Sequence, residues 1–227
     1  RGVLELGQTQ PELRIKYRRV IREFFLELVA ERRKEPRDDI VSQLLEAEVD
    51  GERLVDHKVA GICNLLLVAG IDTTWSSIGA ALLHFAATAQ DRRRVAGERD
   101  LMPTAIEEML RFYAPVTMAR KVTEPVTVGD VTFNPGEKVL LNFPAANRDP
   151  AAFERADEVV LDRERNRHIA FGVGIHRCAG SNLARMEMDI ALNTWFDRIP
   201  EFELSDADAV TWSGGQVRGP RNIPVRF

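Results

Sequence analysis

The sequence of 227 residues is 44% hydrophobic and 29% charged, with a formal net charge of −4. These values are typical of a folded globular protein and argue against a disordered or fibrous chain. The slight acidic excess provides no electrostatic basis for nucleic-acid binding, which favours a basic surface. Two cysteines without C-x-x-C spacing and four histidines argue against a disulfide framework or a zinc site. We therefore expect a protein from a reducing compartment, the cytoplasm.

Hydrophobic residues recur at helical spacing in the first part of the chain. They predict a helix over residues 10–34, which ends before Pro36 because the residue preceding a proline resists helical geometry. Asp39 is positioned to cap a second, short helix, and the turn at Asp50 and Gly51 closes it.

A long helix is expected from about residue 57 to about residue 88, a stretch without proline. Its residues are apolar nearly all round, which is typical of a helix buried in the middle of a domain. The longest apolar run, residues 59–71, is interrupted by a polar residue and is too short for a membrane span. Gly70, Asp72 and Thr73 lie inside this helix. Glycine weakens a helix and polar side chains are unusual in a buried one, so these residues suggest a function.

The periodicity changes in the second half of the chain. Two more helices are expected over residues 91–98 and 104–113, and alternating hydrophobic residues between 120 and 142 then predict a small antiparallel sheet. Residues 145–166 are polar and irregular, another helix begins at residue 181 and ends before Pro200, and short strands close the chain. The predicted fold is therefore mainly α, with small antiparallel β-sheets.

The segment with the most specific pattern is F-G-V-G-I-H-R-C-A-G, residues 171–180. Its glycines permit turn conformations that other residues rarely adopt, and the predicted helix after it places Cys178 just ahead of a helix N-terminus. Unpaired N–H groups and the positive end of the helix dipole stabilise a thiolate there. Such a thiolate is a suitable axial ligand for haem iron, whereas a lone cysteine is otherwise most often a buried, unreactive residue.

This segment resembles the haem-binding signature of the cytochromes P-450, F-G-x-G-x-H-R-C-x-G. The positions that the signature specifies are all present, at Phe171, Gly172, Gly174, His176, Arg177, Cys178 and Gly180. The resemblance implies a cytochrome P-450 fold of the soluble bacterial type, haem b as the cofactor and Cys178 as the iron ligand. It also implies that residues 1–227 are the C-terminal part of a single haem-thiolate monooxygenase domain.

A second motif supports the same family. Residues 69–74 read A-G-I-D-T-T, similar to the oxygen-activating motif that the family carries in its long central helix. The resemblance implies that Ala69 and Gly70 lie against the haem and leave room for dioxygen, and that Asp72 and Thr73 relay protons during oxygen activation. Without the resemblance, threonines bonded to their own helix carbonyls and an exposed Asp72 are the simpler interpretation.

Glu108 and Arg111 have E-x-x-R spacing, which places both side chains on one helix face. The spacing alone is a weak signal, and it recurs at residues 164–167 outside any predicted helix. In the family this pair joins an arginine of the irregular segment before the cysteine loop, for which Arg163 is the candidate. The implied role is structural, because a buried charge requires a partner.

Several other positions are assigned by the resemblance alone. Arg120 and His176 are expected to bind the haem propionates, although solvated surface charges are the alternative for both. Phe171 is expected to keep water from the sulfur, Gly180 to donate its backbone N–H to it, and Gly172 belongs to the same cofactor-binding segment. The residues suggested for a mostly apolar substrate pocket are Leu66, Ala69, Thr73, Val116, Thr117, Met118, and Gln216 or Val217.

His57, His84, Cys63 and several arginines belong to no specific motif. His57 and His84 lack an evident partner, and Cys63 is most simply a small core residue. Five arginines form a further hypothesis, a basic face for an acidic electron donor, although surface arginines are usually just solvated; they are Arg92, Arg93, Arg94, Arg177 and Arg185.

For the complete protein, the resemblance implies a haem-dependent monooxygenase that activates O2 and hydroxylates or O- or N-dealkylates a small organic substrate. Electrons are expected ultimately from NAD(P)H, through a ferredoxin- or flavin-type redox partner, with no nucleic-acid or membrane partner. The alternatives are a peroxide-driven haem-thiolate peroxygenase, which does not need the acid–alcohol pair, and a non-catalytic haem-binding protein. The chain does not begin with Met, and we expect an N-terminal part of the same protein to complete it.

Overall fold

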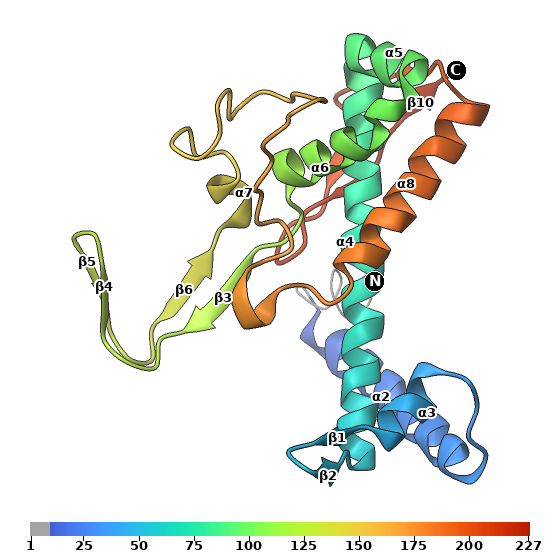
Figure 1. Ribbon diagram of the computed structural model, residues 1–227, viewed down its shortest axis with the longest axis vertical. Coiled ribbons are helices and arrows are strands. Elements are labelled where there is room, and N and C mark those ends of the chain that lie inside the picture. The colour runs from blue at the N-terminus through green and yellow to red at the C-terminus, as the bar shows by residue number, and fades with distance from the viewer. Residues whose placement is uncertain (1–9) are drawn as a thin grey trace. The chain divides into compact units, whose positions relative to one another are not determined.

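The computed structural model describes residues 10–227 and is mainly helical, with five two-stranded antiparallel sheets in that part of the chain (Figure 1). The chain divides into two compact units, and the boundary between Asp72 and Thr73 lies inside the long helix α4, Asp56–Ala87. The predicted fold class is confirmed.

The first unit contains helices α2 and α3, a short hairpin and the first part of α4. Helix α2 spans Pro11–Lys34, α3 spans Ile40–Glu46, and strands β1 (Glu48–Val49) and β2 (Glu52–Arg53) pair antiparallel. The side chain of Asp39 accepts a hydrogen bond from the Ser42 N–H and caps α3. A small core joins these elements: Phe25, Val29, Val41, Leu45, Val59, Ala60 and Cys63.

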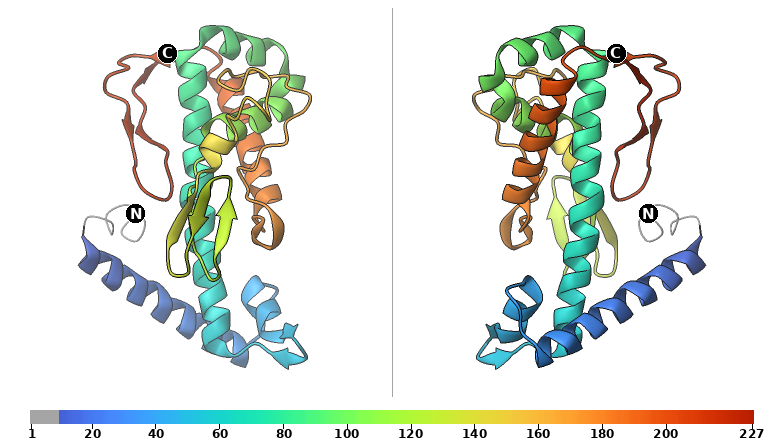
Figure 2. Two further views of the ribbon diagram at one scale, coloured as in Figure 1. Left: turned by 90° about the vertical axis from the view of Figure 1, so that its left-hand side faces the viewer. Right: turned by 90° about the vertical axis from the view of Figure 1, so that its right-hand side faces the viewer.

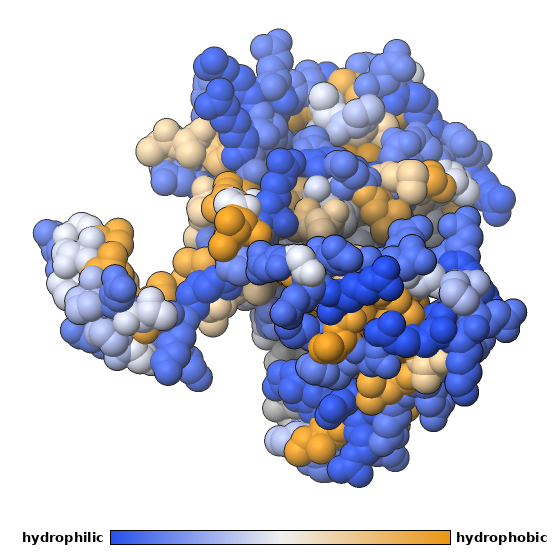
Figure 3. Space-filling model, turned by 60° about the horizontal axis from the view of Figure 1, so that its bottom comes forward, coloured by the Kyte–Doolittle hydropathy of each residue, from blue (hydrophilic) through white to orange (hydrophobic). Residues whose placement is uncertain are grey.

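The middle of α4 does not have the burial that its hydropathy predicts. Leu65 is 64% exposed, Leu66 is 45% exposed and Ile71 is 57% exposed. Figure 3 shows apolar side chains as orange areas on the molecular surface. In residues 10–227, α4 is also the one helix whose length and composition match a membrane span, a test that core helices of soluble proteins pass as well.

In the second unit, three helices pack on the last turns of α4. They are α5 (Ala89–Gly97), α6 (Met102–Tyr113) and α8 (Ser181–Arg198), and a short 3-10 turn, η1 (Arg99–Leu101), leads into α6. Their shared core contains Ala81, Phe85, Ala86, Val95, Met102, Ala105, Ile106, Met109, Leu110, Met188, Leu192 and Phe196. This packing brings the helix with the E-x-x-R pair next to the helix that follows the cysteine.

The predicted sheet between residues 120 and 142 is a pair of two-stranded ribbons. Strand β3 (Met118–Lys121) pairs with β6 (Lys138–Leu141), and β4 (Val126–Val128) pairs with β5 (Val131–Phe133). Figure 1 shows the β4–β5 hairpin extending beyond the β3–β6 ribbon. The short helix α7 (Phe143–Ala146) follows, and then a long irregular segment leads to the cysteine loop.

The C-terminal strands lie against α4. Strands β7 (Glu203–Leu204) and β10 (Val225–Arg226) pair, as do β8 (Thr211–Trp212) and β9 (Pro220–Asn222). Figure 2 shows these strands on one side of α4 and the other helices of this unit on the opposite side. The approach is close at Gly219, where an added Cβ would come within 2.3 Å of the Ser76 side chain.

Candidate functional site: the cysteine loop and its charge clusters

The cysteine loop is a tight turn closed by one backbone hydrogen bond. Gly172 and Gly174 have φ values of 70° and 66°, in the left-handed region that favours glycine. The turn η2 (Gly174–His176) follows, and the Cys178 N–H then donates to the Phe171 carbonyl at 2.8 Å. The loop conformation therefore depends on where Phe171 is held.

Cys178 has an exposed thiol, three residues before the first residue of α8. Gly180 is the N-cap of α8, and a Cβ at that position would lie 3.9 Å from the Cys178 sulfur. The sulfur therefore lies beside the first turn of a helix, whose N–H groups lack intrahelical partners. An outward-facing thiol in that position fits the single protein ligand of a haem-thiolate site. Within residues 10–227 no cluster of His, Cys, Asp and Glu offers a multi-ligand metal site instead.

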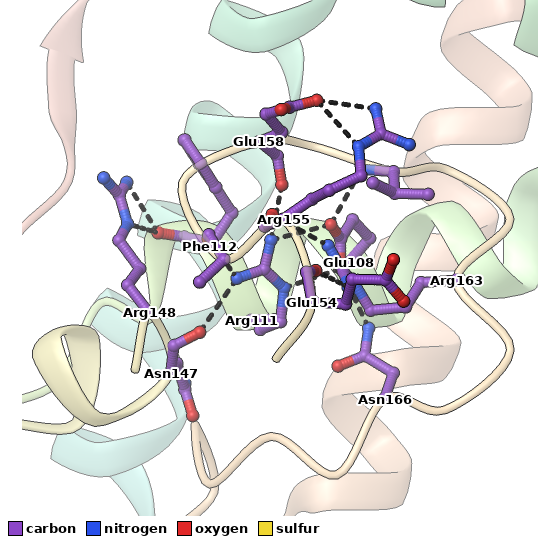
Figure 4. A network of polar contacts seen from close by, with 12 residues as sticks. Glu108, Arg111, Phe112, Asn147, Arg148, Glu154, Arg155, Glu158, Arg163 and Asn166 are labelled. Atoms are coloured by element: carbon purple, nitrogen blue, oxygen red, sulfur yellow. Dashed lines mark hydrogen bonds and ion pairs between the residues drawn. The ribbon is translucent and has the colours of Figure 1, made fainter. Parts of the chain in front are cut away.

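A buried charge cluster lies next to this loop, on α6. Glu108 and Arg111 are both fully buried, and they form a bidentate ion pair with two N–O distances of 2.8 Å. Figure 4 shows the Arg111 guanidinium between α6 and the irregular segment. Two parallel hydrogen bonds to a carboxylate are the strong arrangement for an arginine, and here the exclusion of water makes both partners necessary.

Arg111 also organises the irregular segment through its backbone. Its guanidinium donates to the carbonyl oxygens of Asn147, Ala156 and Glu158 at 2.7–2.8 Å. Sequence reasoning missed these acceptors, because every residue has a carbonyl and no residue type marks the ones that are used.

Glu108 accepts three further hydrogen bonds from the same segment. Arg163 Nε donates at 3.0 Å, the Val160 N–H at 2.8 Å and the Asn166 side-chain amide at 3.1 Å. Burial raises the pKa of Glu108, but the hydrogen bonds from Arg111 and Arg163 outweigh that effect and leave the pKa below its ordinary value. The structure thus brings Glu108, Arg111 and Arg163 together around one carboxylate.

Asn147 connects this cluster to the cysteine loop. It is fully buried, its carbonyl accepts from Arg111, and its side-chain oxygen accepts from the Ile169 N–H at 2.8 Å. Ile169 lies two residues before Phe171, the carbonyl of which holds the Cys178 N–H. A continuous series of hydrogen bonds therefore leads from the buried ion pair to the beginning of the loop.

The structure also brings together part of the suggested substrate pocket. Val116 forms a β-bridge with Val217, and the Thr117 N–H donates to the Gln216 carbonyl at 3.0 Å. Met118 begins β3, and its sulfur lies 3.1 Å from the Gln216 side-chain amide.

The other predicted site residues lie on α4, β3 and the cysteine loop. Leu66, Ala69 and Gly70 belong to the first unit, and Asp72 and Thr73 adjoin its boundary within α4. In the second unit, the Arg120 side chain donates to the Ala119 carbonyl at 3.0 Å, and His176 is exposed in η2.

Two predictions about lone side chains are wrong. His84 does have partners: its ring nitrogens lie 2.7 Å from an Asp91 oxygen and 3.2 Å from the Tyr113 hydroxyl. Arg92 belongs to no basic face, because it is 4% exposed and donates to the Phe85 carbonyl. In both cases helix packing, which the sequence does not specify, supplies the partner.

Comparison with known proteins identifies the family. The family model described as Cytochrome P450 matches residues 8–208. The chain belongs to the cytochrome P450 family. It is 38% identical over 222 residues to cytochrome P450 107B1 of Saccharopolyspora erythraea, covering 96% of this chain and 55% of that protein.

Other similar proteins are also cytochromes P450. The mycinamicin IV hydroxylase/epoxidase of Micromonospora griseorubida is 36% identical, covering 88% of this chain and 51% of that P450. The solved structure of the polyketide synthase cytochrome P450 PksS of Bacillus subtilis superposes with a TM-score of 0.92 at 32% identity, covering 99% of this chain and 59% of that one. The chain thus spans little more than half the length of the P450s that it matches.

Proposed function

We propose that the protein containing this chain is a haem-dependent monooxygenase, and that residues 1–227 are the C-terminal part of its single domain. The observation that carries the proposal is the Cys178 loop, in which an exposed thiol lies before α8 on a backbone tied to Phe171. One relative is named as a hydroxylase/epoxidase, which supports oxygen insertion as the reaction class.

In this proposal Cys178 is the iron ligand and haem b is the cofactor. Haem with a thiolate ligand supplies the activation of O2, and the protein binds, orients and shields the reactants. Phe171 keeps water from the sulfur, and the backbone at Gly172 and Gly180 shapes the turn around it. Arg120 and His176 bind the propionates.

The long helix α4 supplies the proton path. Ala69 and Gly70 would border the cofactor, where their small size would leave room for dioxygen. Asp72 and Thr73 would hold protons and donate them during the reduction of dioxygen. The pair also argues for reduction of dioxygen rather than for direct use of peroxide.

The finer points of the proposal concern substrate and partners. The substrate is a small organic molecule that is hydroxylated or O- or N-dealkylated, and it contacts Leu66, Val116, Thr117, Met118 and Val217. A ferredoxin- or flavin-type partner delivers electrons that come ultimately from NAD(P)H. The N-terminal part of the same protein completes the fold, and the protein acts in the cytoplasm.

The test of the cofactor assignment is the carbon monoxide difference spectrum of the reduced holoprotein. We expect the Soret band of thiolate-ligated haem, lost in Cys178→Ala and retained in Cys63→Ala, because Cys63 is buried in the core of the first unit. A thiolate band that survives Cys178→Ala contradicts the ligand assignment.

The test of the proton path is the coupling of NAD(P)H oxidation to product. Thr73→Ala is expected to consume reductant with little product while retaining haem, and Thr74→Ala, at the adjacent buried threonine, is the matched control. Equal coupling in both variants removes Thr73 from the path. Turnover with peroxide but none with NAD(P)H favours the peroxygenase instead.

A further inference from the structure

Glu107 binds a different element from its neighbour Glu108. Arg185 of α8 holds the Glu107 carboxylate in a bidentate pair, with Nε 2.5 Å from one oxygen and the terminal nitrogen 2.9 Å from the other. The two residues are 78 positions apart, and both side chains are about two-thirds buried, with 32% and 30% of their surface exposed. The pair therefore clamps α6 to the first turns of α8, the helix that begins next to Cys178.

The Arg185 guanidinium also contacts the cysteine loop itself. Its central carbon lies 4.6 Å from the centroid of the Phe171 ring, a cation–π distance. A third nitrogen lies 3.4 Å from the carbonyl of Ser181, the first residue of α8. One side chain thus contacts both ends of the loop that presents Cys178.

His168 adds a second contact to Glu107 from the chain that enters the loop. Its Nε2 lies 3.0 Å from the Glu107 carboxylate, and its Nδ1 lies 3.2 Å from the Ala170 nitrogen. Because the Ala170 N–H can only donate, Nδ1 accepts and Nε2–H donates, which assigns one neutral tautomer to the ring. The His168 and Phe171 rings are 6.0 Å apart. Glu107 therefore holds both His168 and Arg185, the two side chains whose contacts with the Phe171 ring are described above.

The pKa shifts in this cluster favour the ionised forms of Glu107 and Arg185. Burial raises the pKa of Glu107, but the hydrogen bonds from Arg185 and then His168 outweigh it and lower the pKa to about 2. The pKa of Arg185 is raised, first by the hydrogen bond to Glu107 and then by the negative charge of that carboxylate. Both groups are therefore ionised at neutral pH.

We propose that Glu107 and Arg185 are positioning residues for the thiolate ligand, acting through Phe171. The Phe171 carbonyl holds the Cys178 N–H at 2.8 Å, so side chains that hold the Phe171 ring also hold the backbone that orients the sulfur. The inference rests on the proposed haem-thiolate function for its consequence, and on the contacts of this chain for its geometry.

The chain offers a matched control at the other end of α8. Arg99 pairs with Asp197 through one contact of 2.9 Å and lies over the Phe196 ring at 5.4 Å, so it too combines an ion pair with a ring contact, near the last residue of α8 and away from Cys178. We compare Arg185→Gln and Glu107→Gln with Arg99→Gln in the holoprotein. Arg185→Lys is the conservative variant, which keeps the charge but loses the fork and the flat stacking surface.

Two measurements report on the conformation of the cysteine loop. The first is the fraction of the reduced, CO-bound haem that absorbs as the thiolate form, and the second is the hydrogen-exchange rate of the Cys178 amide. Arg185→Gln and Glu107→Gln are expected to lower the thiolate fraction and to speed exchange at Cys178 about fivefold, the effect of losing roughly one hydrogen bond. Arg185→Lys should lie between them and the parent, and Arg99→Gln should match the parent.

The outcomes separate this inference from the proposed function. If the parent lacks the thiolate band, the proposed function is wrong, while amide exchange at Cys178 still decides whether Arg185 positions the loop. If Arg185→Gln and Glu107→Gln match Arg99→Gln in thiolate fraction and in exchange, the positioning role is wrong. If Arg185→Gln does not fold, Glu107→Gln and Arg185→Lys give the same decision.

Discussion

Two neighbouring glutamates on α6 hold two different regions of the molecule. Glu108 is fully buried and binds Arg111, Arg163 and the irregular segment before the cysteine loop. The Glu107 side chain is 30% exposed and binds Arg185 of α8 and His168. Successive helix residues point about 100° apart, so the two carboxylates of one helix reach different partners.

The difference in burial changes what each carboxylate does. A charge without access to water depends entirely on its partners, so Glu108 makes the irregular segment part of the core. A charge with partial access to water can lose a partner at lower cost, so Glu107 adjusts the position of the loop rather than deciding whether the chain folds. Substitutions at the two positions should therefore differ in size and in kind.

The largest effect is expected for Glu108→Gln. The substitution leaves the Arg111 charge buried without its carboxylate, and we expect the free energy of unfolding to fall by about 3–5 kcal/mol. Urea denaturation measures the change. Arg155→Gln is the control, because Arg155 pairs with Glu158 where both side chains are more than half exposed, and it should unfold like the parent. If Glu108→Gln lowers the free energy of unfolding no more than the control does, the buried ion pair does not stabilise the fold as proposed.

The next effect is expected for Glu107→Gln and depends on pH. The folded pKa of Glu107, about 2, is below its ordinary value of 4.5, so its contribution is complete above pH 4.5 and disappears as the pH falls through 2. At pH 7 the variant should therefore be less stable by up to about 3 kcal/mol, and near pH 2 it should match the parent. Unfolding by urea between pH 2 and pH 7 tests this.

Glu203→Gln is the control for that pH series, since Glu203 pairs with Arg226 at an exposed position. Its stability should follow that of the parent across the range. If the Glu107 variant is less stable than the parent by the same amount at pH 2 and at pH 7, the charge of the carboxylate does not explain the lost stability.

The smallest effect is expected for Asn147→Ala, which tests the link between the buried cluster and the loop. The change leaves the Ile169 N–H without its acceptor, and we expect a loss of about 1–3 kcal/mol, with faster exchange of that amide. Asn193→Ala removes only a contact to Asp189 within α8 and should cost less. Unchanged exchange at Ile169 indicates that the loop is held without Asn147.

Much of the site is readable from the sequence because it is local. The E-x-x-R spacing predicts a pair on one helix turn, and the structure has Glu108 and Arg111 in that arrangement. The two glycines before Cys178 predict a turn, and both have positive φ. The carbonyl acceptors of Arg111 were not predictable, because no side chain marks them.

The long helix α4 shows that hydropathy predicts burial less well than it predicts the helix itself. Its apolar composition predicts a helix and predicts burial, and the structure confirms the helix over Asp56–Ala87 but leaves large apolar side chains in its middle exposed. Hydropathy reports what a side chain prefers, and burial depends on which other elements pack against it. In the described residues, Leu65 and Ile71 remain exposed although Val59 and Phe85 are fully buried.

By itself the sequence determined the helices, the turn chemistry, the position of Cys178 before a helix and the family to which the chain belongs. These features depend on residues a few positions apart, where backbone geometry is known in advance. Only the tertiary structure decided that Glu107 binds Arg185, that His168 and Arg185 both contact Phe171, and that His84 has partners. Contacts between residues such as Glu107 and Arg185, 78 positions apart, depend on how α6 and α8 pack, and that packing follows from the shapes of many side chains at once.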